Sequence, residues 1–183
     1  MEIHLLSVDD AEAFWHLRLE ALRNDPASFA DSAQEHLKTT VETAKGLLGK
    51  SDPASNFVVG MFEDGKLVAT AGFYQYTHIK ERHKGHIWGV YVRPESRGKG
   101  AARALMQEII RRAKRIDGLE QILLVASAHL PARKLYEAMG FAAYGIEPRS
   151  LKLLREKTTE QTGVEYVDDV LMVLFLNDIR TTE

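Results

Sequence analysis

Glycine and basic residues are clustered between Arg97 and Arg103, where the chain reads Arg-Gly-Lys-Gly-Ala-Ala-Arg. Gly98 and Gly100 lack a Cβ atom, so the backbone can curl tightly and bring its N–H groups close to an anion. Arg97, Lys99 and Arg103 can neutralise negative charge, and arginine can bind two oxygens at once. This chemistry suits a diphosphate. A solvated turn with surface charges would have the same composition.

Residues 97–103 do not match either of two familiar phosphate-binding patterns. A P-loop requires Gly-x-x-x-x-Gly-Lys-Ser/Thr, and neither Lys84 nor Lys99 lies in that pattern. A dinucleotide-binding loop requires a third glycine at the position where Arg103 stands. The sequence therefore predicts an anion site of another kind.

The neighbouring elements must position this loop. Residues 86–92 predict a strand, and apolar side chains recur at helical spacing from about Gly100 to Ala113. The almost continuous apolar run at 121–126 predicts a strand buried on both faces. A strand, a helix and a strand in this order imply two neighbouring parallel strands.

The whole chain predicts an α/β protein with a mixed sheet and helices on both faces. The expected order is β-α-α-β-β-β-α-β-α-β-β. Outside the central unit, strands are expected at 3–6, 56–62, 66–76, 142–154 and 166–176, and helices at about 11–24, 32–48 and 131–139. The Asp64-Gly65 pair predicts a hairpin between the second and third strands.

Length and composition predict one domain over residues 1–183, with 45% hydrophobic and 27% charged residues. A net charge of −2 gives no general attraction to nucleic acid or anionic membranes, so neither is expected as a partner. The absence of cysteine excludes disulfides, cysteine nucleophiles and thiolate zinc sites. The first residues lack the features of a signal peptide, and the longest apolar run, 170–176, has the length of a strand. A cytoplasmic protein is expected.

Two separate blocks of the sequence match one family. Arg97, Gly100 and Ala102 fit the pattern Arg/Gln-x-x-Gly-x-Gly/Ala, after a strand that ends in Val-Tyr-Val-Arg-Pro at 90–94. Residues 132–141 read Ala-Arg-Lys-Leu-Tyr-Glu-Ala-Met-Gly-Phe, which fits the second block, Ala-x-x-Leu-Tyr-x-x-x-Gly-Phe. In this combination the chain resembles the GNAT superfamily of N-acetyltransferases. The ends of the chain resemble a bacterial branch of it.

The resemblance implies a GNAT fold and an activity. The expected reaction transfers the acetyl group of acetyl-CoA directly to a primary amine in a ternary complex, without a covalent acyl-enzyme. Acetyl-CoA and an amine acceptor are thus the expected partners, and a homodimer is compatible with the family. The alternative is a CoA-binding sensor or interaction module with the same fold.

The resemblance also implies where the cofactor lies. The main chain of 90–92 should pair with the pantetheine arm, and 97–103 should hold the pyrophosphate. Gly89 indicates a bulge that would open a slot beside the strand, although close packing against a neighbour would also require glycine. A main-chain N–H near Val90 would then polarise the thioester carbonyl. His129 stands where the family often has asparagine. The expected cofactor-binding residues are Val90, Tyr91, Val92, Arg97, Gly98, Lys99, Gly100, Ala101, Ala102, Arg103 and His129.

Tyr136 is the expected general acid, because a phenol can protonate or hydrogen-bond the leaving thiolate. An amphipathic core tyrosine is the plainer interpretation. His86 is the candidate general base, with an unperturbed pKa of about 6.5, or else a surface histidine at a strand end. His78, His83 and His86 lie in or beside a loop without a rigid metal-binding motif, so no metal site is expected.

The acceptor is less well defined by the sequence. Residues 1–50 contain nine acidic and five basic residues, which favours a cationic amine. The basic helix end at 111–115 lies roughly 16–23 Å from Gly100 along the helix, too far to contact the same ligand.

Overall fold

A mixed β-sheet forms the centre of the computed structural model, which describes residues 1–128, 131–154 and 164–176. Within these ranges the sheet has seven strands in the order β1-β2-β3-β4-β5-β7-β6. The pair β4–β5 is parallel and the other neighbours are antiparallel. The strands are β1 (Glu2–Leu5), β2 (Asn56–Glu63), β3 (Lys66–Gln75), β4 (Lys84–Val92), β5 (Gln121–Ser127), β6 (Ala142–Leu154) and β7 (Val164–Phe175). The predicted α/β class and mixed sheet are confirmed.

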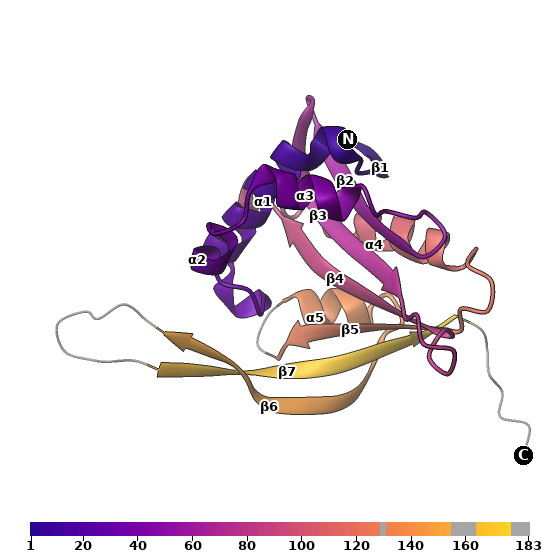
Figure 1. Cartoon of the computed structure of the whole chain (residues 1–183). Coiled ribbons are helices and arrows are strands. Elements are labelled where there is room, and N and C mark those ends of the chain that lie inside the picture. The colour runs from indigo at the N-terminus through magenta and orange to yellow at the C-terminus, as the bar shows by residue number, and fades with distance from the viewer. Residues whose placement is uncertain (129–130, 155–163, 177–183) are drawn as a thin grey trace, which may run out of the picture.

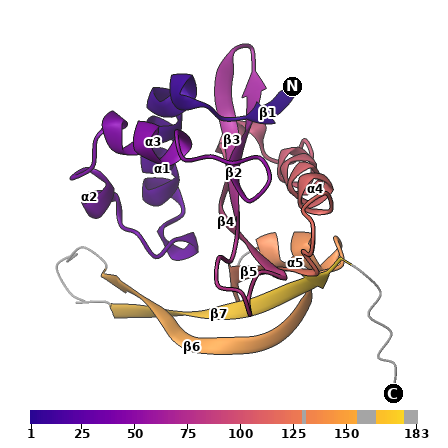
Figure 2. The ribbon, with the colours of Figure 1, turned by 45° about the vertical axis from the view of Figure 1, so that its right-hand side comes forward.

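Helices cover both faces of the sheet (Figure 1). On one side lie α1 (Ala11–Asn24), α2 (Ala33–His36) and α3 (Val41–Leu48); on the other lie α4 (Ala101–Ala113) and α5 (Ala132–Glu137) (Figure 2). Each side has its own buried cluster. The side chains of Leu105, Met106 and Ile109 pack against the sheet from α4, and those of Phe14, Leu17 and Leu22 do so from α1. None of the described helices is long and apolar enough to cross a membrane.

The strands β4 and β5 separate after a short paired region. They pair only where Lys84–His86 lie beside Gln121–Leu123, and then diverge. Gly89 has φ +64°, and the pairing of β4 with β3 shifts there, leaving Gly89 and Val90 together opposite Ala71. Such an extra residue bends a strand and re-aims its side chains. Trp88 therefore packs with the α1 cluster, whereas Val90 packs with the α4 cluster.

The predicted helix at 32–48 is interrupted at Leu37–Thr40 and forms the separate helices α2 and α3. The Thr39 hydroxyl donates to the carbonyl of His36 at 2.7 Å and accepts from Trp15 Nε1 at 3.0 Å. Threonine side chains that bond to nearby backbone groups compete with a continuing helix. The local hydroxyl bond and the long-range contact to α1 together account for the break.

The prediction that β5 is buried on both faces is wrong. Ile122 and Leu124 are buried against α4 and α5, but Val125 is 44% exposed on the opposite face. The helices α1 to α3 lie over β1 to β4 (Figure 2), and the short turn Pro26–Ser28 reaches β5 without covering Val125. Val125 lies two residues beyond Leu123, the last residue of β5 that pairs with β4.

Candidate active site

A groove of about 430 Å³ runs along the free edge of β4. The strand residues Val90–Val92 form one side. The loop at 97–100 and the first turn of α4 form another, and Pro131, Ala132, Leu135 and Tyr136 close it from α5. Asp25 and Ser28, which precede α2, complete the lining. The groove thus brings together most of the residues expected to bind the cofactor, namely Val90, Tyr91, Val92, Arg97, Gly98, Gly100, Ala101, Ala102 and Arg103. Lys99 is not part of the lining.

The glycine loop presents free backbone donors to this groove. Gly98 and Gly100 have φ of +75° and +83°, a region that side-chain-bearing residues rarely adopt. Gly100 is the N-cap of α4, and no side chain caps this helix end. The first turn contains no acidic residue either. The N–H groups and the positive end of the helix dipole are therefore available to an anion, which fits a diphosphate.

Beyond His86, the edge of β4 that borders the groove has no neighbouring strand among the described residues. The N–H of Arg93 donates to Val68 of β3 at 2.9 Å. The main-chain N–H and C=O groups of successive residues in a strand point alternately to its two edges. Those of Val90 and Val92 therefore point away from β3, toward the groove. The carbonyl of Val92 accepts from Arg97 Nε at 2.9 Å. The groups of Val90 lie where an extended ligand could pair with them.

The groove continues into a slot of about 80 Å³ between β4 and β5. Residues 87–90 form one wall of the slot and 124–127 the other, and Phe29 lies against it from the α1 side. Tyr136 lines both the groove and the slot. Its side chain is 6% exposed and packs edge-on against Phe141, with 6.1 Å between the ring centroids. Burial raises the pKa of Tyr136 to about 12, so the phenol keeps its proton at neutral pH.

Residues 13–141 match the sequence model of the acetyltransferase (GNAT) family. The chain belongs to the GNAT family. Acetyl-CoA is the acetyl donor that this family uses.

Solved structures of GNAT and related acetyltransferases share the fold. A GNAT acetyltransferase from Streptococcus pneumoniae has a TM-score of 0.79 at 19% identity, over 95% of this chain and 98% of that one. A putative acetyltransferase from Salmonella typhimurium, solved with its cofactor acetyl-CoA, has a TM-score of 0.78 at 18% identity, over 100% and 98%. A ribosomal-protein-alanine N-acetyltransferase from Brucella melitensis has a TM-score of 0.76 at 19% identity, over 96% and 99%.

Two of the three cations in the GNAT loop are paired with acidic side chains. Arg97 forms an ion pair with Asp25 through Nη2, and its guanidinium lies 5.7 Å from the centre of the Tyr91 ring. Lys99 Nζ lies 3.8 Å from a carboxylate oxygen of Glu63. Arg103 is exposed on the first turn of α4 and lines the groove. The groove therefore contains an acidic side chain as well as the predicted cations.

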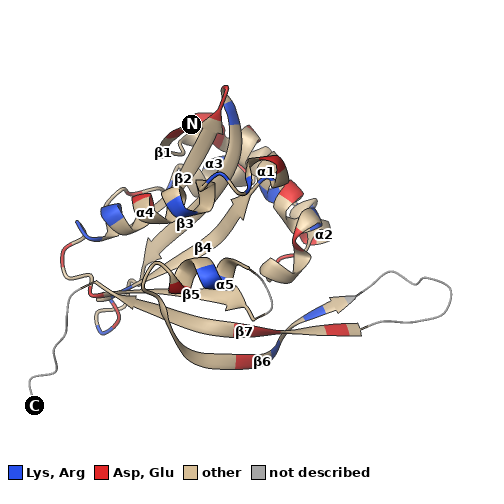
Figure 3. Cartoon of the chain, turned by 180° about the vertical axis from the view of Figure 1, so that it is seen from behind, with Lys and Arg blue, Asp and Glu red and all other residues tan. Residues whose placement is uncertain are grey.

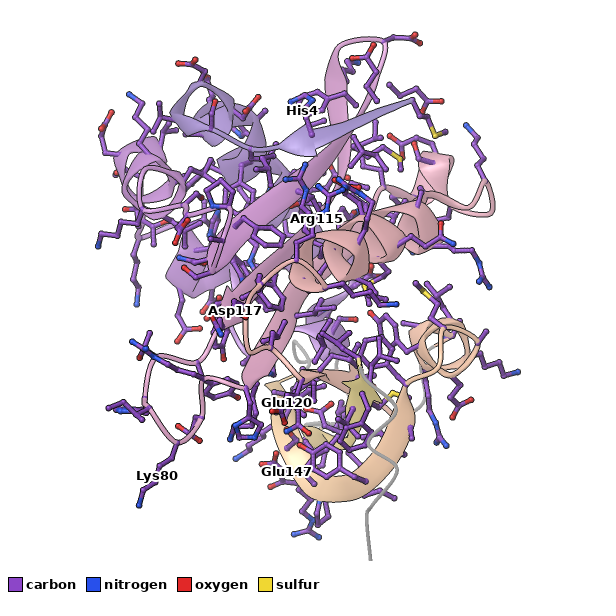
Figure 4. The ribbon with its side chains drawn as sticks, turned by 90° about the vertical axis from the view of Figure 1, so that its right-hand side faces the viewer. His4, Lys80, Arg115, Asp117, Glu120 and Glu147 are labelled. Atoms are coloured by element: carbon purple, nitrogen blue, oxygen red, sulfur yellow. The ribbon has the colours of Figure 1, made fainter. Side chains whose placement is uncertain are left out.

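The basic end of α4 takes no part in the groove. Arg111 and Arg112 both pair with Glu108 at 2.6 Å, on the helix surface. Arg115, labelled in Figure 4, follows the end of α4 that is opposite to the loop.

His86 lies on β4 at the last residue that pairs with β5, three positions before the bulge glycine. Its ring stacks on Tyr74 with 5.4 Å between centroids, and Nδ1 is buried without a hydrogen-bond partner among the described residues. Burial lowers the pKa of His86 below its usual 6.5, so the ring is neutral at pH 7. The ring does not line the groove or the slot. His129 lies outside the described residues.

Sequence reasoning missed the segment that closes the groove from the α1 side. Asp25 and Pro26 were recognisable only as the end of a helix, and nothing in the local pattern indicated that Asp25 would meet Arg97, 72 residues away. Ser28 and Phe29 reach the slot because the turn Pro26–Ser28 folds back over β5. Contacts of this kind depend on tertiary packing and leave no periodic signal. Within the described residues no group of histidine and acidic side chains could hold a metal ion.

Proposed function

We propose that this protein is an N-acetyltransferase that transfers the acetyl group of acetyl-CoA directly to a primary amine. The observation that carries the proposal is a continuous path from the glycine loop at 97–100 to the slot at Tyr136. The loop suits a pyrophosphate, the edge of β4 suits an extended arm, and the slot suits the small reacting group. The acetyltransferase solved with acetyl-CoA has the same fold, which supports this assignment.

The residues of the path have distinct roles in the proposal. Backbone N–H groups of Gly98–Ala102 hold the pyrophosphate, with Arg97 and Arg103 balancing its charge. The main chain at Val90 orients the pantetheine arm, and its N–H polarises the thioester carbonyl. Acetyl-CoA supplies an activated acetyl group and a thiolate leaving group. Tyr136 donates a hydrogen bond to that thiolate from the α5 side of the sheet.

A proton must leave the acceptor ammonium before it can attack. His86 is neutral at pH 7 and is therefore chemically able to accept the proton. Because its ring does not line the slot, a water molecule must connect it to the amine if it acts as the base. Direct transfer also requires both substrates to be bound together, and in this proposal the acceptor enters the slot beside the exposed side chain of Val125.

The test is the release of CoA thiol from acetyl-CoA in the presence of a panel of amino acids, polyamines and peptides with free N-termini. The proposal expects acceptor-dependent release, with double-reciprocal plots that intersect, as in a ternary complex. Parallel plots would indicate a covalent acetyl-enzyme and contradict direct transfer. Tight CoA binding without release for any acceptor would instead indicate a CoA sensor.

A further inference from the structure

Arg18, on α1, places its guanidinium against the bulge that opens the slot. A Cβ atom built on Gly89 would lie 3.6 Å from Arg18 Nη1. The guanidinium carbon lies 4.6 Å from the centre of the Phe29 ring. Gly89 and Phe29 both line the slot. Arg18 thus flanks the slot from the α1 side, while Tyr136 reaches it from the α5 side. An acceptor bound at Arg18 and the acetyl group of acetyl-CoA near Tyr136 would therefore approach the slot from opposite faces of the sheet.

The hydrogen bonds of this guanidinium are incomplete. Nη2 donates to one carboxylate oxygen of Asp31 at 2.9 Å. Nη1 is buried and has no hydrogen-bond partner among residues 1–128, 131–154 and 164–176. The Arg18 side chain is only 14% exposed, whereas that of Asp31 is 68% exposed. A buried donor without a partner is costly, and an exposed carboxylate held by one bond is easily replaced.

Among the described residues, no charged side chain lines the slot itself. Its lining consists of apolar, aromatic, glycine and serine residues. Figure 3 shows β4 and β5 almost entirely in tan, the colour of uncharged residues. A cation beside an uncharged slot attracts an anion and repels a second cation. The fork of Nη1 and Nη2 matches a carboxylate that binds with both oxygens.

We propose that Arg18 binds the carboxylate of the acceptor, and that the acceptor is a small amino acid whose amine lies close to that carboxylate. The acceptor carboxylate replaces Asp31 on Nη2 and also satisfies Nη1. Its amine then lies beside the bulge, where the acetyl group is expected. This inference rests on the proposed acetyltransferase function and specifies its substrate class. It opposes the cationic acceptor that the acidic excess of residues 1–50 favours, because a polyamine would bring a second cation to the guanidinium.

The experiment compares the 20 protein L-amino acids with their carboxamides, which keep the amine and lose the negative charge. Thiol release gives kcat and KM for each pair with the wild-type protein, Arg18→Met and Asp31→Asn. Methionine keeps an unbranched stem over Phe29 and removes the fork. We expect the wild type to prefer carboxylates. Because a hydrogen bond to a charged group is worth about a 10- to 150-fold change in affinity, Arg18→Met should raise KM for the preferred amino acid by that factor and change KM for its carboxamide less than about twofold.

Asp31→Asn distinguishes substrate binding from a structural ion pair. If Arg18 binds the acceptor, removing its competitor should lower KM for the amino acid, the opposite of the effect of Arg18→Met. If the pair only holds the segment before α2 in place, both variants should lower the unfolding midpoint and impair amino acids and carboxamides alike, which would overturn the inference. Equal use of amino acids and carboxamides by the wild type would also overturn it.

The failure of the proposed function has a different signature. If no amine releases thiol, calorimetry with the CoA-loaded protein and the same amino acids tests Arg18 directly. Binding that Arg18→Met abolishes would retain the carboxylate site without the transferase activity. No binding of any amino acid would reject the Arg18 site as well.

Discussion

Replacing Tyr136 by phenylalanine removes the hydroxyl that is proposed to stabilise the departing thiolate. The structure limits how this hydroxyl can act. Burial raises the pKa of Tyr136 to about 12, whereas a thiol such as that of cysteine has a pKa of about 8.5. Full proton transfer to a thiolate would therefore be uphill by about 3.5 pKa units, or about 5 kcal/mol. In the proposed mechanism the phenol therefore acts as a hydrogen-bond donor that keeps its proton.

The size of the expected effect follows from that distinction. A hydrogen bond to a charged group contributes about 1.5–3 kcal/mol, so Tyr136→Phe should lower kcat by about 10- to 150-fold. A loss near the upper end for general acids, about 10,000-fold, would indicate proton transfer. Phenylalanine keeps the ring against Phe141, so the affinity for acetyl-CoA should change little.

The assay measures kcat by thiol release, acetyl-CoA affinity by calorimetry, and the unfolding midpoint as a check on folding. Tyr144→Phe is the matched control, because Tyr144 is 58% exposed on the edge strand β6 and should tolerate the same change. Unchanged kcat in Tyr136→Phe would refute the assigned role. A parallel fall in kcat and acetyl-CoA affinity would show that the hydroxyl serves packing rather than chemistry.

Three further variants test separate parts of the account. Asp25→Asn removes the carboxylate that pairs with Arg97 in the groove and so competes with the pyrophosphate for it. Because partly exposed ion pairs are worth about 0–1 kcal/mol, calorimetry should show acetyl-CoA binding up to about fivefold tighter. Weaker binding would contradict competition between Asp25 and the pyrophosphate. Burial lowers the pKa of His86, so His86 takes up a proton in the unfolded chain before it does so in the folded protein as the pH falls below about 6.5. The free energy of unfolding should therefore decrease below that pH. In denaturant titrations, His86→Gln should make the free energy of unfolding depend less on pH. Gly72→Ala would place a Cβ 2.2 Å from the Trp88 ring and should cost about 1–3 kcal/mol through overpacking. Gly46→Ala is the control with nothing within 4 Å, and equal unfolding midpoints of these two variants would contradict the packing around the bulge.

The parts of the fold that the sequence predicted correctly are those with a local cause. The turn at Asp64-Gly65 has φ of +50° and +74°, the conformation that this pair favours. The parallel pair β4–β5 follows from the helix that connects the two strands, because a helical crossover returns the chain to the same end of the sheet. The bulge was indicated by a single glycine, Gly89, within an otherwise regular strand.

The parts that could not be predicted depend on contacts between distant segments. Thr39 interrupts a helix with the help of Trp15 on α1. Val125 is exposed because the helices α1 to α3 lie over β1 to β4 and do not extend over it, which its apolar neighbours in the sequence do not reveal. No pattern in the sequence distinguishes Arg18 from the other basic residues, and it lies beside Gly89 only because α1 packs against the sheet. The proposed acetyl-CoA path could thus be outlined from motifs, whereas the proposed acceptor site at Arg18 required the structure.

Whether the glycine loop holds acetyl-CoA is decided by a calorimetric titration of acetyl-CoA into the wild-type protein and into Gly100→Trp. A Cβ atom built on Gly100 would meet no atom within 4 Å. Because Gly100 lines the groove, we expect the indole to block the ligand while the core stays intact. Its φ of +83° adds about 1–2 kcal/mol of backbone strain, which the unfolding midpoint would report. We expect one acetyl-CoA site in the wild type and no measurable binding in the folded variant. Equal affinity in the two proteins would contradict it.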